Sequence, residues 1–130
     1  MTIPLTTLRS TLATALSNPT VWQVFSFPPA TPLANSVIVS PDDPYVTPNN
    51  NSHLAISPTA HFKIVMTVPA FDNQGNLAGI ENIALGVYGL LAKSGITFNS
   101  SGISAPAILS VASGDLLTAE LSVQILTSWE

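Results

Sequence analysis

The sequence contains no cysteine and very few charged residues. Its 130 residues carry three cations and seven carboxylates, so 8% of the chain is charged, against about 25% in an average globular domain. Without cysteine there is no disulfide, no thiolate nucleophile and no cysteine-ligated zinc. The cations, Arg9, Lys63 and Lys93, are scattered, whereas phosphate backbones and anionic membranes attract clustered Lys and Arg. The composition therefore argues against direct binding of nucleic acid or of a membrane surface.

Long apolar runs are also missing. A membrane-spanning helix needs a stretch of about 18 or more apolar residues, and the sequence has none. The first residues, MTIPLTTLRS, lack the basic start, apolar stretch and cleavage site of a signal peptide. We therefore expect a protein that is made in the cytoplasm and leaves it only as part of a particle.

The chain is nevertheless apolar, with 46% hydrophobic residues. Monomeric proteins rarely expose large apolar patches, so a chain with so little charge is expected to have much of its surface covered by other subunits. The alternative is a poorly soluble monomer whose surface is rich in Ser, Thr and Asn. At this length we expect one domain, residues 1–130, with a single core.

Two segments have the apolar spacing of helices. In the first, which ends before Pro19, we expect Thr2 to cap the helix and Pro4 to occupy its first turn. The second is expected to begin after a cap at Asn73 or Asn76 and to stop at Gly95. The residues that define the two stripes are Leu5, Leu8, Leu12 and Leu16 in the first helix, and Leu77, Ile80, Ala84, Val87 and Leu91 in the second.

Five segments are rich in β-branched and aromatic residues, which favours strands. In the third, Phe62, Ile64, Met66 and Val68 alternate with more polar residues and predict one buried face. The last two flank a short turn that contains Gly114, as in a β-hairpin. These strands are residues 21–27, 36–40, 61–68, 107–111 and 116–127. The predicted fold is α/β (α+β): a single mixed sheet of about five strands, two main helices packed on one face, and a C-terminal β-hairpin.

The second helix contains Gly79, Gly86 and Gly89. Glycine inside a helix costs about 1 kcal/mol relative to alanine, so a packing reason is expected. One interpretation is tight packing against the sheet of the same chain, which we favour. The other is close approach of the backbone to a neighbouring subunit.

The segment 41–58 contains four prolines, which exclude a helix and interrupt strand pairing. We predict an irregular loop, and an irregular loop of this length in a small domain is usually functional or disordered. It is expected to have difficulty burying its apolar residues within its own chain. These residues are Tyr45, Val46, Leu54 and Ile56.

Residues that could carry chemistry are few. His53 and His61, with Asp42 and Asp43, do not have the spacing of a zinc site. Adjacent carboxylates in a proline-bounded turn diverge, whereas an acid/base pair must converge. There is no nucleophile elbow, phosphate loop or dinucleotide fingerprint. We therefore predict no enzymatic activity, no metal and no cofactor.

Several strings in chain order resemble the tail terminator (tail completion) proteins of bacteriophages with long non-contractile tails, in particular those of actinobacteria. The opening helix TTLRSTLATAL comes before a strand with Phe25, Pro28 and Pro29. A buried strand leads into SPDDPYV, in which Asp43-Pro44-Tyr45 is the most distinctive part. A strand near His61, the string NQGN at the start of a helix, and a C-terminal hairpin complete the likeness, which spans nearly the whole chain.

The resemblance implies a structural virion protein that is assembled in the host cytoplasm. Such proteins form a ring, expected here to be a homo-hexamer, at the head-proximal end of the tail tube. They stop tube polymerisation and dock the tail to the head-completion or connector proteins. The tail tube protein, and the tape measure protein that sets the tube length, are the other partners implied. DNA passes through the lumen of such a ring without specific binding.

We expect subunit contacts in the proline-rich segment. A tryptophan near the C-terminus is either at the edge of the core or an interface anchor, because tryptophan is enriched at binding hot spots. The candidate interface residues are Asp43, Pro44, Tyr45, Val46, Leu54, Ile56 and Trp129. Three alternatives remain open. They are another head–tail joining or tail-tube protein, a small-ligand-binding module with a pocket between sheet and helices, and an enzyme whose site lies near His53 or His61.

Overall fold

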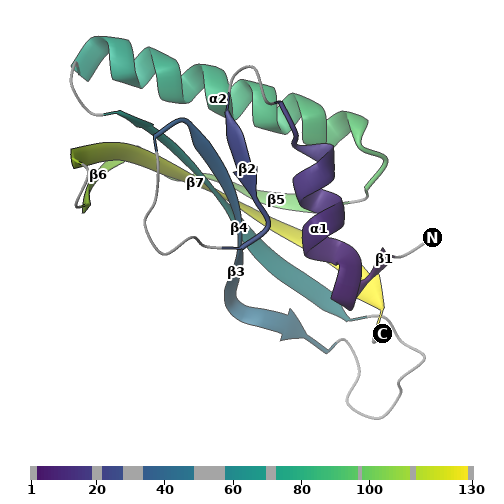
Figure 1. Cartoon of the computed structure of the whole chain (residues 1–130). Helices are drawn as coiled ribbons and strands as arrows, with labels where there is room; N and C mark the ends of the chain where they lie inside the picture. Colours follow the sequence, from purple (N-terminus) through teal and green to yellow (C-terminus); the bar gives the residue numbers. More distant parts are fainter. Residues whose placement is uncertain are drawn as a thin grey trace.

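A computed structural model describes residues 3–18, 22–27, 34–48, 58–69, 73–96, 98–111 and 114–128. Within these residues the chain forms a mixed sheet of seven strands with two helices. The elements are β1 (Ile3–Pro4), α1 (Leu5–Ala15), β2 (Gln23–Phe25), β3 (Ser36–Thr47), β4 (Thr59–Pro69), α2 (Asn73–Lys93), β5 (Phe98–Ile103), β6 (Ala107–Val111) and β7 (Gly114–Ser128). This confirms the predicted α+β class and the mixed sheet (Figure 1).

The sheet is built around β7. Its strand order is β1-β7-β4-β3-β2, and β5 and β6 also pair with β7. Because β4 occupies one edge of β7, the other edge is shared in succession by β6, β5 and β1. The pairing of β4 with β7 is continuous and antiparallel, from Thr59 opposite Leu126 to Pro69 opposite Leu116. The predicted C-terminal hairpin is therefore β6 and β7.

Alternation along β4 and β7 defines the buried face of the sheet. Phe62, Ile64, Met66 and Val68 are all buried, as the sequence predicted. Their neighbours on β7 across the pair are likewise buried or packed against the core, because cross-strand partners share a face. These neighbours are Val123, Leu121, Ala119 and Leu117.

Both helices cover this one face. The α1 stripe of Leu8, Leu12 and Leu16 is fully buried, and α1 packs on β3 and the end of β7. The longer α2 packs on β4 and β7. Its residues in the common core are Ile80, Ile83, Val87 and Leu91. Neither helix is long and apolar enough to cross a membrane, within the part of the chain described.

The predicted start of α1 needs a correction, and the predicted end of α2 is confirmed. Thr2, the predicted cap of α1, lies outside the described residues. The N-cap of α1 is Pro4, without a side-chain capping hydrogen bond, because proline fixes the entry into the helix but has no group to cap it. At the other end of α2, Gly95 has a φ of 80°, which confirms the predicted glycine stop.

The glycines of α2 differ in their surroundings. A Cβ on Gly86 would lie 2.9 Å from Cη2 of Trp22, a buried side chain of the same chain. A Cβ on Gly79 would lie 3.8 Å from Val68, and one on Gly89 would meet nothing within 4 Å. Packing within the chain, the favoured interpretation, thus holds for Gly86.

The sequence prediction missed two strands and shortened another. Ile3–Pro4 forms β1, and Phe98–Ile103 forms β5. The sequence of β5, FNSSGI, has little β-branched character, and pairing with β7 overrides that weak local propensity. The predicted strand 36–40 continues to Thr47, so 41–47 is not an irregular loop. In contrast, the strand expected over 21–27 is shorter, Gln23–Phe25, and Val21 lies outside the described residues.

Candidate functional site

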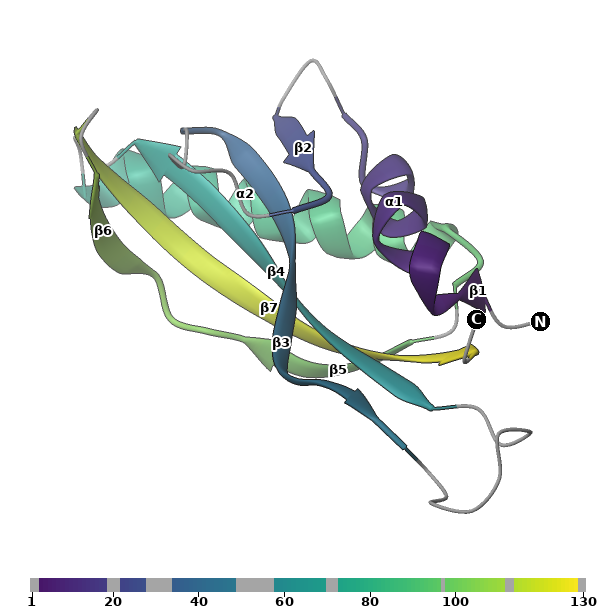
Figure 2. The ribbon, with the colours of Figure 1, turned by 60° about the horizontal axis from the view of Figure 1, so that its bottom comes forward.

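The end of the β3–β4 pair projects beyond the rest of the sheet (Figure 2). It contains Asp43, Pro44, Tyr45 and Val46, four of the residues that the sequence indicated as a subunit contact. The register between the two strands shifts between Pro41 and Val46, where β3 has extra residues relative to β4. The Asp43–Pro44 peptide bond within this shift is cis. Because proline donates no hydrogen bond, the bulge is where the strand tolerates it.

Tyr45 packs against residues of its own chain. Its ring meets the edge of Phe62 with a centroid separation of 5.6 Å, and Tyr45 packs against the main core. The expectation that this segment cannot bury its apolar residues is therefore wrong for Tyr45, because the strand continues far enough to place the ring over β4. Val46 is half-buried opposite Ala60.

The contact between Tyr45 and Phe62 allows a prediction about the stability of the isolated subunit. Tyr45→Ala is expected to lower the free energy of unfolding by about 1–2 kcal/mol, because it removes a half-buried aromatic ring and its edge contact. Urea denaturation of dilute protein measures this difference. Leu85→Ala is the control, since Leu85 is 74% exposed and should change the stability by less than about 0.5 kcal/mol. An unchanged stability for Tyr45→Ala would show that the ring contributes nothing within its own chain.

Some of the remaining candidate residues lie within the described ranges and others do not. His61 lies on the sheet face away from the helices, and its Nε2 is 2.7 Å from Oγ1 of Thr47. Across the described ranges, no three His, Asp or Glu residues are grouped as a metal site would require. The other candidates from the sequence lie outside the described residues; they are Leu54, Ile56, Trp129 and His53.

A second surface was not predicted from the sequence. A groove of about 480 Å³ runs between α2 and the edge formed by β5 and β6. Leu77, Leu85 and Ile103 line it and are 43%, 74% and 45% exposed. Tyr88 continues the apolar surface along α2, at 44% exposure. The complete lining is Leu77, Ile80, Glu81, Asn82, Ala84, Leu85, Ile103, Ser104, Pro106 and Ala119.

The groove exists because the edge changes course between β5 and β6. The N–H of Ser104 donates to the carbonyl of Glu120 at 2.8 Å, and the N–H of Glu120 donates to Oγ of Ser104 at 2.9 Å. Between Ile103 and Ala107 the edge has one residue more than the facing part of β7. Pro106, just after this point, has no N–H to resume the pairing. Since α2 packs on β4 and β7, the space beside it stays open.

A sequence signal for the groove was present in α2. The helix is apolar on more than one face, and such a helix must be covered on more than one side. The sequence prediction assigned Leu77 to the core stripe. The structure corrects this, since Leu77 is 43% exposed and lines the groove.

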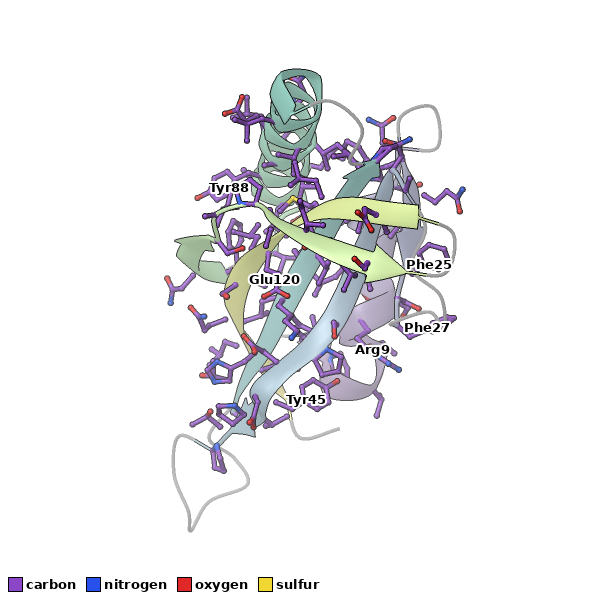
Figure 3. All side chains as sticks on the ribbon, turned by 90° about the vertical axis from the view of Figure 1, so that its left-hand side faces the viewer. Arg9, Phe25, Phe27, Tyr45, Tyr88 and Glu120 are labelled. Carbon is purple, nitrogen blue, oxygen red and sulfur yellow. The ribbon has the colours of Figure 1, made fainter. Side chains whose placement is uncertain are left out.

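The opposite edge of the sheet, at β2, has a pair of aromatic side chains. Phe25 in β2 and Phe27 just after it form an edge-to-face pair with centroids 6.5 Å apart. Phe27 is 54% exposed. Figure 3 shows both rings and Arg9 on one side of the molecule and Tyr88 on the other. This aromatic pair and the groove thus lie at opposite edges of the sheet.

Comparison with known proteins adds no assignment. The sequence matches no family model and no curated protein. The function therefore has to be argued from the surfaces themselves.

Proposed function

We propose that this chain is a non-enzymatic structural subunit that assembles into a ring, as a tail terminator at the head-proximal end of a phage tail tube. The observation that carries the proposal is the apolar groove between α2 and the β5–β6 edge. Leu85, at 74% exposure, is the most exposed of its apolar side chains. Contiguous apolar surface of this kind marks an interaction site.

The charge distribution supports the same proposal. A ring subunit loses surface on two sides to its neighbours, which suits a chain with 8% charged residues. A lumen that lets DNA pass should not hold phosphates, and three cations are too few to do so. The hexameric count, the tube protein and the connector proteins as partners come from the sequence resemblance described above.

A second candidate has one observation in its favour. The groove has the volume of a small-molecule site, which is commonly about 300–1,000 Å³, and its lining is largely apolar. A module that binds a small apolar ligand would use this groove as a monomer or dimer. Another head–tail joining protein or a tail-tube subunit would instead use it between copies.

The mass of the native assembly distinguishes between these functions. The purified chain should be measured by native mass spectrometry at several concentrations, alone and with the tail tube protein from the same genome. We expect a discrete ring, or a monomer that becomes a ring on the end of a tube. Electron microscopy of the mixture should show tubes capped at one end.

The other outcomes decide between the alternatives. A monomer that ignores tubes would contradict the terminator function and favour the ligand-binding module. Open-ended polymers of this chain would favour a tube subunit. Bovine serum albumin at the same concentration is the control for nonspecific association with tube ends.

A further inference from the structure

Two apolar surfaces lie at opposite edges of one sheet. The first is the groove defined above. The second, here called the aromatic edge, consists of Phe25 and Phe27. The strand order places them apart, since β5 and β6 pair with β7 on the far side of β4, whereas β2 ends the sheet beyond β3. Figure 3 shows the same separation, with Tyr88 and Phe27 on opposite sides.

We propose that the aromatic edge of one copy docks into the groove of a second copy, and that this contact repeats head to tail around the ring. The inference rests on the proposed ring, and it names the two surfaces that the ring would join. The occupant of the groove is thus a second copy of this chain. Phe27, the more exposed ring of the pair, is the anchor.

The groove is large enough for the ring of Phe27. A groove of about 480 Å³ lies in the range of about 300–1,000 Å³ that encloses drug-sized molecules, so it accommodates the phenyl ring of Phe27. The ring would contact Leu77, Leu85 and Ile103, which are exposed now and would be covered. Aromatic anchors that fill apolar pockets are typical of the residues that dominate binding.

The charges of the two surfaces are complementary. Glu81 is exposed and lines the groove. Arg9 is exposed on α1, on the same side of the molecule as Phe27 (Figure 3). Neither α1 nor β2 contains an acidic residue. Lys93 is twelve residues beyond Glu81 on α2, or about 18 Å along the helix, so it does not neutralise the groove carboxylate directly.

The geometry points to a heterologous contact rather than a two-fold one. In a two-fold dimer the same patch meets itself, whereas here two different patches meet. Each copy then keeps one free groove and one free aromatic edge until the ring closes. Because the groove and the aromatic edge are separate, variants of each can be mixed to test the contact. A residue that only stabilises its own chain would not give the result expected from that mixture.

Two single variants and a matched control test the contact. Phe27→Ser and Leu85→Ser each change an exposed side chain, and Leu126→Ser is the control, since Leu126 is 48% exposed on the face away from the helices. We expect each of the first two variants to need about tenfold or more higher concentration for half-assembly of the ring. Leu126→Ser should assemble as the wild type does. Circular dichroism melting curves report whether each variant is folded.

Mixing the two variants is the decisive measurement. Phe27→Ser keeps an intact groove and Leu85→Ser keeps an intact aromatic edge, so an equal mixture should form a heterodimer by native mass spectrometry that grows no further. Neither variant alone should form this dimer.

The opposite results would overturn the inference in recognisable ways. If both variants form rings at wild-type concentrations, the contact is wrong while the proposed ring stands. If folded variants fail to form the mixed dimer, or the control loses the ring as completely, the pairing of these two surfaces is wrong. If the wild type forms open polymers that both variants block, the contact stands and the terminator function fails.

Discussion

Phe62→Ala is expected to lower the free energy of unfolding by about 3–5 kcal/mol. Phe62 is the largest of the fully buried side chains and has no exposed surface. It lies in β4 between Pro41 of β3 and Val123 of β7, and it supports the ring of Tyr45. Truncation removes the transfer free energy of the ring and leaves a cavity that three paired strands cannot close, which is the basis of the large cost.

Urea denaturation measures this loss, with Phe62→Leu as the second variant in case the alanine form does not fold. Leucine keeps most of the apolar volume, so we expect a loss below that of alanine, about 1–2 kcal/mol. Leu126→Ala is the control, because Leu126 is 48% exposed on the neighbouring strand, and should cost less than about 1 kcal/mol. Equal effects of Phe62→Ala and Leu126→Ala would contradict the assignment of the core face.

Gly86→Ala and Gly89→Ala are expected to change stability in opposite directions. Alanine is favoured over glycine in a helix by about 1 kcal/mol, so Gly89→Ala, with nothing within 4 Å of its new Cβ, should stabilise by about 0.5–1 kcal/mol. At Gly86 the Cβ would lie 2.9 Å and 3.2 Å from two ring atoms of Trp22. Overpacking of this kind costs about 1–3 kcal/mol, which exceeds the helix gain, so a net loss of up to about 2 kcal/mol is expected.

The indole cannot easily move aside. Its Nε1–H donates to the carbonyl of Leu16 at 2.9 Å, and Trp22 is buried. Thermal melting of the two variants beside the wild type gives the sign of each effect. A stabilising Gly86→Ala would mean that Trp22 has room to shift, and the packing reason for this glycine would be lost.

The elements that the sequence predicted correctly are those with strong local periodicity. The alternation of Phe62, Ile64 and Met66 fixed the core face of β4, because a one-residue slip would expose every one of them. The spacing of Leu8, Leu12 and Leu16 likewise located the buried stripe of α1. In both cases the pattern lies within a single segment.

Features that depend on a distant partner were not predictable. The strand β5 has a weak propensity and exists because β7 offers a free edge. The continuation of β3 through Pro41 and Pro44 depends on pairing that resumes at Val46 and Thr47 opposite β4. The apolar faces of α2 indicated a further contact, but the groove itself depends on the change of course at Ser104, and no local pattern in the sequence indicates where an edge strand will leave its neighbour.

The central place of β7 has a consequence for synthesis on the ribosome. It is the last of the described strands, yet β1, β4, β5 and β6 all pair with it. At about 5–20 residues per second, the chain between β4 and β7 takes seconds to translate, and during that time the edge of β4 that pairs with β7 has no strand beside it. The nascent protein therefore passes through a stage with an unpaired strand edge, and a chaperone that shields such edges would act on it before the four pairings of β7 are made.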